Sequence, residues 1–209
     1  MKLFYAAPSP FARKVRIVAR ERGLMGRMEE ISVNLFHDDP RLLAANPGGL
    51  VPTLILDNGT PLIDSPLIAH YLDTVGTAPR LIPDDETRWQ VLHHEALADA
   101  LMDFAVAGVY EKRRTDAPPS QAFIDRKLAK IIRCIASLPD KSATNTETFT
   151  LGDIATACAL GYLDFRYPDT NWRAQRLNWR VQRPDLADWF ATIKTRPAFQ
   201  ETHPTEHTR

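Results

Sequence analysis

The chain has 209 residues, 44% of them hydrophobic, and its 26 basic and 26 acidic residues give a formal net charge of zero. This length is sufficient for one large domain or two small ones with packed cores. The even charge balance lacks the electrostatic signature of a protein that binds nucleic acid or an anionic membrane surface. We see no signal peptide and no apolar stretch long enough to span a membrane, so we expect a cytoplasmic location.

The two cysteines, Cys134 and Cys158, lie far apart and have neither a CxxC spacing nor a Cys/His spacing. This pattern argues against a disulfide framework and against a zinc site. We therefore expect no metal, and we expect both cysteines to be small buried residues within helices.

The first third of the chain alternates between strand and helix patterns. We expect strands at 2–6, 28–34, 53–57 and 60–63 and helices at 10–22 and 65–75. Asp57-Asn58-Gly59 predicts a hairpin turn, because Asn and Gly tolerate the positive φ that such turns need. The order predicts an α/β sandwich with one hairpin, and with an irregular or helical segment between the second and third strands.

Residues 76–85 contain a glycine, two prolines and two acidic residues, a composition typical of a linker. Beyond them almost everything reads as helix. We expect helices at 86–107, 121–138, 151–165 and 184–194, the third of them almost uncharged and central. The segments 144–150 and 167–178 read as loops. We therefore predict a first domain at 1–77, a linker at 78–85 and an all-helical domain at 86–209.

Two Ser-Pro pairs, Ser9-Pro10 and Ser65-Pro66, begin expected helices. Serine is a favoured N-cap and proline is favoured at the first helical position, so capping alone explains both pairs. A hydroxyl at a helix N-terminus also suits an anion, because the backbone dipole and free N–H groups point at it. Thr150-Leu151-Gly152-Asp153 predicts a capping box, which we interpret as a folding device.

These motifs follow one another in a fixed order. Lys2–Tyr5 leads into Ser9-Pro10-Phe11, then comes Asn46-Pro47-Gly48-Gly49-Leu50-Val51-Pro52, and then Asp64-Ser65-Pro66. In this order and at these spacings they resemble the glutathione-binding domain of the glutathione S-transferase superfamily. The resemblance covers nearly the whole chain and is nearest to a bacterial branch with the same Ser-Pro-Phe and Asp-Ser-Pro motifs. It implies a thioredoxin-like α/β domain followed by an all-α domain, glutathione as co-substrate, and a homodimer.

The resemblance also implies roles for single residues. Ser9 would be the catalytic residue, whose hydroxyl donates a hydrogen bond to the glutathione thiolate. The Val51–Pro52 bond would be cis, and the backbone of Val51 would pair with the cysteine unit of glutathione. Ser65 would bind the γ-glutamyl carboxylate. Most relatives carry Glu where this chain has Asp64, so the shorter side chain would contact glutathione either directly or through water.

Other candidates have two readings each. Phe11 lines the thiol pocket or fills the interdomain core, and His37 meets the glycine carboxylate or is an ordinary loop residue. Tyr5 is a rival catalytic hydroxyl, although its position in a strand favours packing. A final set lines the pocket of an apolar co-substrate or, as we favour, belongs to the core: Met102, Tyr110, Trp172 and Trp179.

We predict that the chain is a glutathione transferase of the detoxifying kind. Its bound thiolate would add to a hydrophobic electrophile or displace a leaving group from it. Serine at the motif position argues against disulfide exchange, which needs cysteine there. Two alternatives stay open. The chain is a non-catalytic ligand-binding or protein-interaction module, or it uses glutathione as a true cofactor in an isomerase or reductive dehalogenase reaction.

Overall fold

The computed structural model describes residues 1–141, 149–168 and 183–206. The described structure divides into two compact units. One comprises Met1–Val91 together with the segment that starts at Arg196, and the other lies within Leu92–Thr195. Most of the two expected loops falls outside the described residues, and so do Trp172 and Trp179. No helix in the described ranges is both long enough and apolar enough to cross a membrane.

The first unit contains a four-stranded sheet with the strand order β2-β1-β3-β4. Its strands are β1 (Lys2–Tyr5), β2 (Glu29–Ser32), β3 (Thr53–Ile55) and β4 (Pro61–Ile63). β1 pairs in parallel with β2 and antiparallel with β3, and β3 pairs antiparallel with β4. The predicted hairpin is confirmed: Gly59 has a φ of 85°, and the Asn58 Oδ1 accepts a hydrogen bond from the Thr60 N–H at 3.0 Å.

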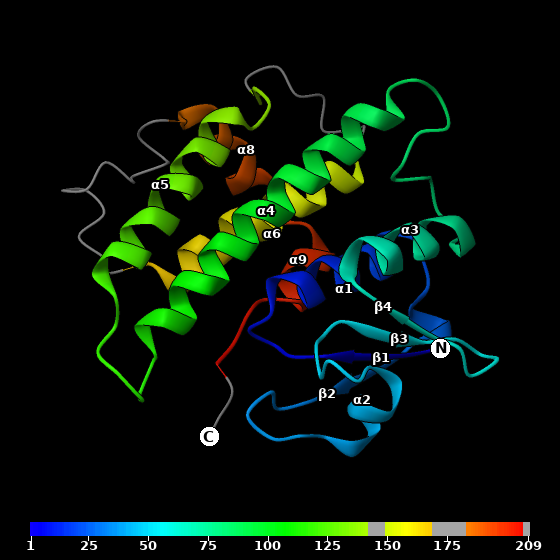
Figure 1. The fold of residues 1–209 in the computed structure, drawn as a ribbon. Helices are drawn as coiled ribbons and strands as arrows, with labels where there is room; N and C mark the ends of the chain where they lie inside the picture. The colour runs from blue at the N-terminus through cyan, green and yellow to red at the C-terminus, as the bar shows by residue number, and fades with distance from the viewer. Residues whose placement is uncertain (142–148, 169–182, 207–209) are drawn as a thin grey trace. The chain divides into compact units, whose positions relative to one another are not determined.

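Helices cover both faces of this sheet. α1 (Pro10–Glu21) and α3 (Ser65–Val75) lie on one face, and α2 (Pro40–Ala45) lies on the other (Figure 1). Two elements escaped the sequence analysis, the short 3₁₀ helix η1 (Met25–Arg27) and α9 (Pro197–Glu201). α9 packs on α1, where the Arg13 guanidinium donates a hydrogen bond to the Phe199 carbonyl at 3.1 Å.

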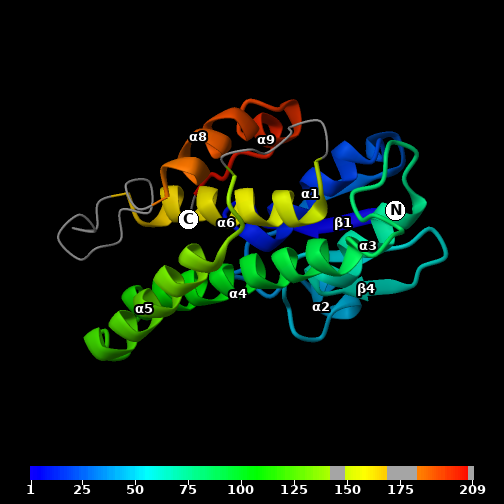
Figure 2. The same ribbon diagram turned by 90° about the horizontal axis from the view of Figure 1, so that it is seen from above.

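The second unit is helical and includes α5 (Gln121–Ser137), α6 (Leu151–Arg166) and α8 (Pro184–Ile193), while α4 (Arg88–Lys112) begins just before the division. α6 runs between α4 and α8 (Figure 2) and is buried from Leu151 to Leu163, which confirms its predicted central position. Its capping box is also confirmed. The Thr150 Oγ1 accepts from the Asp153 N–H at 3.2 Å, and the Asp153 Oδ2 accepts from the Thr150 N–H at 2.9 Å.

Element boundaries differ modestly from the predicted ones. The helix at 65–75 was predicted to the residue, whereas α4 runs five residues beyond the predicted end, to Lys112. The strands are shorter than predicted, because pairing between β1 and β2 stops at Tyr5 and Ser32. Cys134 and Cys158 are buried and helical, as predicted.

Candidate functional site

One edge of the sheet gathers the sequence-predicted site residues. β1, β2 and β4 end at this edge and β3 begins there, because β3 runs antiparallel to both of its neighbours. Thr53 is level with Phe4 on one side and with Ile63 on the other. Ala6 and Ser65 lie two residues after these paired positions along the chain and Val51 lies two residues before Thr53, so all three are next to the strand ends at this edge. We call this the site edge.

A small core holds the segments of the site edge together. It combines the end of β1 with the first turn of α1, the residue after β2, one side chain of α2 and the residue before Pro52. Its buried members are Phe4, Ala6, Ala12, Val33, Leu42 and Val51. Because these segments share one packed core, their backbone positions at the site edge are coupled.

Ser9 occupies the turn between β1 and α1. Its N–H donates to the Ala6 carbonyl at 2.9 Å, and its Oγ accepts from the Ala12 N–H at 3.2 Å. Ser9 is therefore the N-cap of α1, with Pro10 as the first helical residue, as predicted. The side chain is half-buried, so its hydroxyl combines a fixed position with partial exposure to solvent.

The start of α3 corrects one expectation. Asp64, and not Ser65, is the N-cap residue, and its side chain makes no capping bond. The chain turns from β4 into α3 at Asp64, which has φ 75° and ψ 132°, and its carbonyl accepts the first helical bond from the Ile68 N–H. Ser65 is the first residue of the helix and is 2% exposed, so packing fixes it. The N–H groups of Ser65 and Leu67 lie in the first turn, where they have no intrahelical acceptor.

The Val51–Pro52 peptide bond is cis, the isomer that the resemblance implies. Both residues are buried, and Val51 belongs to the core of the site edge. Behind them the structure adds two residues that the sequence analysis missed, the buried pair Asn46 and Thr53. Their one sequence signal is the run Asn46-Pro47-Gly48, since Asn before Pro and Gly is typical of a turn closed by the Asn side chain.

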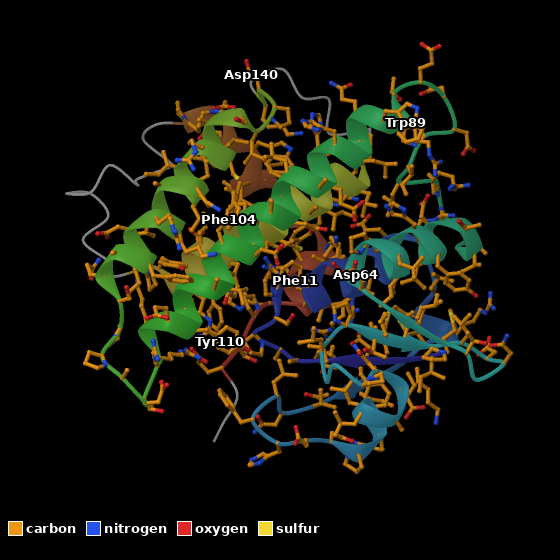
Figure 3. All side chains as sticks on the ribbon, in the orientation of Figure 1. Phe11, Asp64, Trp89, Phe104, Tyr110 and Asp140 are labelled. Atoms are coloured by element: carbon orange, nitrogen blue, oxygen red, sulfur yellow. The ribbon has the colours of Figure 1, made fainter. Side chains whose placement is uncertain are left out.

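The three candidates with two readings each, Phe11, His37 and Tyr5, differ in exposure and in contacts. Phe11 is half-buried on α1, and Figure 3 marks it together with the exposed Asp64. His37 is exposed in the loop after β2, where its N–H donates to the Asn34 carbonyl at 3.1 Å. Tyr5 has the guanidinium of Arg16 at 4.1 Å from its ring centre and packs against the core, in keeping with a packing role.

The two candidates for a co-substrate pocket that the structure describes lie on α4. Met102 is fully buried, as a core residue would be, whereas Tyr110 is 62% exposed. A cavity of about 690 Å³ lies in the second unit between the end of α5 and the start of α8. Two of its charged lining residues, Arg183 and Asp185, are paired with each other at 2.7 Å, and neither Met102 nor Tyr110 lines it.

The electrostatics of the site edge favour an anionic ligand. α1 and α3 both begin there, and each helix N-terminus carries a partial positive charge. Within the residues that the structure describes, no three His, Cys, Asp or Glu side chains gather as a metal site would require. The arrangement can bind an extended anionic ligand along β3 and hold a second negative charge at the Ser9 hydroxyl.

Comparison with known proteins gives two family matches. Residues 8–75 match the model of the glutathione S-transferase N-terminal domain, and residues 121–192 match the model of the C-terminal domain. An uncharacterised GST-like protein of Escherichia coli K12, YibF, is 34% identical over 98% of both chains.

Solved structures agree with the family matches. A glutathione transferase family member from Pseudomonas fluorescens Pf-5 with bound glutathione is 37% identical, with a TM-score of 0.86 over 98% of this chain and 99% of that one. A second crystal structure from the same source, with bound S-(propanoic acid)-glutathione, has a TM-score of 0.82 at 37% identity over 99% of this chain and 100% of that one. The predicted fold class, a thioredoxin-like domain followed by an all-α domain, is thereby confirmed.

Proposed function

Because the chain belongs to the glutathione S-transferase family, we propose that it binds glutathione at the site edge and holds the sulfur as a thiolate beside Ser9. The thiolate then attacks a hydrophobic electrophile. We place the glutathione-binding domain at residues 1–77 and the helical domain at 86–209.

One observation carries this proposal. The capped start of α1, the cis Val51–Pro52 segment and the start of α3 meet at one edge of the sheet. These three features match, in the order given, a thiol, an extended peptide backbone and a terminal carboxylate, the groups that glutathione combines. The similar Pseudomonas fluorescens protein holds glutathione in its crystal structure, which supports the same ligand class here.

The free-energy requirement for activating the thiol is modest. A free thiol has a pKa of about 8.5, so a thiolate at neutral pH needs a shift of about two units, or roughly 2.7 kcal/mol. A hydrogen bond from a hydroxyl to a charged group contributes about 1.5–3 kcal/mol, and a helix N-terminus adds about 0.3–1 kcal/mol. The Ser9 hydroxyl and the start of α1 can thus supply most of the shift without a general base.

The remaining contacts follow from the chemistry of glutathione. The backbone of Val51 pairs with the cysteine unit as an added antiparallel strand, and the N–H and hydroxyl of Ser65 bind the γ-glutamyl carboxylate. Asp64 lies beside them and accepts hydrogen bonds from the neighbouring ammonium group. Phe11 borders the sulfur, and His37 approaches the glycine carboxylate.

The proposed reaction forms one bond between carbon and sulfur. The sulfur lone pair attacks the electrophilic carbon, and either a leaving group departs with its electron pair or an activated double bond takes up a proton from water. The Ser9 hydroxyl donates to the sulfur before the attack and keeps its own proton. The thioether S-(propanoic acid)-glutathione, bound by the similar Pseudomonas fluorescens protein, is a product of this chemical form.

We also propose a homodimer, as the family resemblance implies. Support comes from large apolar side chains that the first unit exposes near the site edge: Leu50 at 67%, Leu67 at 52% and Ile63 at 45%. Light scattering at micromolar concentration tests this, because a monomer mass would contradict it.

The test of the function begins with binding. We expect titration calorimetry to show glutathione binding to the wild type with a Kd between micromolar and millimolar. Ser65→Ala should abolish it, while Ser137→Ala, at an exposed serine of α5, should bind as the wild type does. An ultraviolet difference spectrum should show a thiolate band in the wild type that Ser9→Ala lacks. Absence of binding at millimolar glutathione would overturn the proposal.

Turnover then separates the alternatives. With a panel of haloaromatic and activated-alkene electrophiles, we expect glutathione to be consumed in step with formation of the thioether. Regeneration of glutathione during turnover would point to an isomerase, and oxidised glutathione together with released halide would point to a reductive dehalogenase. Binding with a thiolate band but without any turnover would favour the binding module.

A further inference from the structure

A buried amide organises the loop that leads from α2 to β3. Asn46 follows α2 directly and is 6% exposed. Its Nδ2 donates to the Leu50 carbonyl at 3.1 Å and to the Thr53 Oγ1 at 3.1 Å, and its Oδ1 accepts from the Gly48 N–H at 3.0 Å. The side chain therefore spans the whole loop and bonds to three points along it.

Thr53 completes the network from the other side. It is fully buried, and its Oγ1 donates to the same Leu50 carbonyl at 2.8 Å. That carbonyl thus accepts two hydrogen bonds from buried side chains, one from Asn46 and one from Thr53. A carbonyl oxygen has two lone pairs, so both of its acceptor positions are used.

The two hydrogen bonds to the Leu50 carbonyl also affect the next residue, Val51. The Leu50 carbonyl and the Val51 N–H belong to one planar peptide unit, in which they point in opposite directions. Two bonds that hold the carbonyl toward the protein interior therefore hold the N–H toward the opposite side. This N–H belongs to Val51, the residue whose backbone pairs with the cysteine unit in the proposed function.

We infer that Asn46 and Thr53 are positioning residues for glutathione, which set the direction of the Val51 N–H by anchoring the Leu50 carbonyl. The inference rests on the proposed function. The network also links α2 to β3, so a purely structural role is the competing explanation. The two differ in what they predict: the structural role affects unfolding, whereas the positioning role affects binding in a folded protein.

Replacement of Thr53 separates the two explanations. Thr53→Val keeps the shape and removes the hydroxyl, and Thr53→Ser keeps the hydroxyl. The matched control is Thr74→Val, in the same unit, because the Thr74 hydroxyl donates to the His70 carbonyl of its own helix at 3.0 Å. Each variant is measured by calorimetric titration with glutathione, by the pH titration of the bound thiolate band and by urea unfolding.

We expect Thr53→Val to raise the Kd for glutathione about tenfold, equivalent to ~1.4 kcal/mol. The thiol pKa of bound glutathione should not change, because Ser9 sets it. Thr53→Ser should stay within about twofold of the wild type, as should Thr74→Val. In the amide spectrum of ¹⁵N-labelled protein, the Val51 signal should shift on addition of glutathione less in Thr53→Val than in the wild type.

The outcomes distinguish the inference from the function. A wild type that does not bind glutathione overturns the proposed function and this inference with it. A wild type that binds, with Thr53→Val binding equally well, overturns the inference alone, whatever the change in unfolding. If Thr53→Val does not fold, Asn46→Asp tests the same point, because it replaces the amide donor by an acceptor that faces the Leu50 carbonyl.

Discussion

The Ser9 Oγ accepts a hydrogen bond from the Ala12 N–H at 3.2 Å. This bond uses a lone pair of the oxygen and leaves the hydroxyl hydrogen available to a second partner. Capping a helix and donating to a thiolate are therefore compatible in one side chain. The sequence left open whether Ser9 caps a helix or binds a thiolate, and the geometry allows both roles at once.

Two substitutions of Ser9 separate these roles. Ser9→Ala should lower the free energy of unfolding by about 1 kcal/mol through loss of the cap, whereas Ser9→Gly should lower it by only a few tenths. Both variants lack the hydroxyl, so both should raise the thiol pKa of bound glutathione toward about 8.5. Urea unfolding and the pH titration of the thiolate band measure the two effects. An unchanged thiol pKa in both variants would remove Ser9 from the mechanism.

Asp64 holds a backbone conformation that disfavours any residue with a Cβ, with φ 75° and ψ 132°. Such conformations cost on the order of 1–3 kcal/mol, part of which glycine recovers. We expect Asp64→Gly to raise the free energy of unfolding by about 1 kcal/mol and to weaken glutathione binding, because the carboxylate is lost. Asp64→Asn keeps the side-chain shape, so it should weaken binding without stabilising the fold. Tight binding by both variants would contradict the role of Asp64.

The sequence predicts the helices of the first unit well because their signals are local. Ser9-Pro10 marks the start of α1, and Gly23 marks its end. It predicts the N-cap of α3 wrongly, because the turn at Asp64 depends on a positive φ that no local preference of Asp specifies. The sequence did not predict the hydrogen bond between Asn46 and Thr53, because this bond depends on how a loop folds back onto a strand.

Contacts distant in sequence were the least predictable. Arginine usually lies at the protein surface, yet Arg13 is 6% exposed and donates a hydrogen bond to the carbonyl of Phe199, 186 residues away. The return of α9 to α1 has no periodic signal, since α9 is only five residues long. The convergence at the site edge was predictable only through the family motifs, because strand order is not encoded in any single segment.

Gly76 is required for space and not for its backbone angles. At its position a Cβ would lie 2.5 Å from the Arg22 Cβ and 2.8 Å from the Arg22 carbonyl oxygen. Arg22 cannot yield easily, because it is 2% exposed and donates to the Gly76 carbonyl at 2.7 Å and the Asp73 carbonyl at 3.0 Å. Gly76→Ala should therefore lower the free energy of unfolding by about 1–3 kcal/mol.

Gly26→Ala is the matched control for Gly76→Ala. No atom lies within 4 Å of a Cβ at Gly26, and its φ is not positive. We expect this variant to unfold as the wild type does or to gain up to about 1 kcal/mol. Both are measured by urea unfolding under one buffer condition. Equal stability of the two variants would show that the contact with Arg22 relaxes at little cost.

His94 on α4 should make stability depend on pH near neutrality. Burial lowers the pKa of His94, and the positive charges of Lys141 and His93 lower it further, whereas Asp153 opposes them. Lys141 is itself fixed, with its Nζ 2.5 Å from the Asp153 Oδ1 in a pair that is nearly buried. The opposing carboxylate is therefore already shared with a cation, so it offsets only part of the effect on His94.

The sign of the pH effect follows from proton binding in the two states. The unfolded chain protonates His94 at a pKa near 6.5, whereas the folded chain does so only at lower pH. His94 therefore leaves the free energy of unfolding unchanged above about pH 7. It lowers that free energy as the pH falls through 6.5 toward the pKa of His94 in the folded chain. Since His94 is partly exposed, solvent screening keeps this loss small. Urea unfolding at pH 7.5, 6.5 and 5.5 should show a smaller decrease in His94→Gln than in the wild type, and an equal decrease in both proteins would exclude His94 as its source.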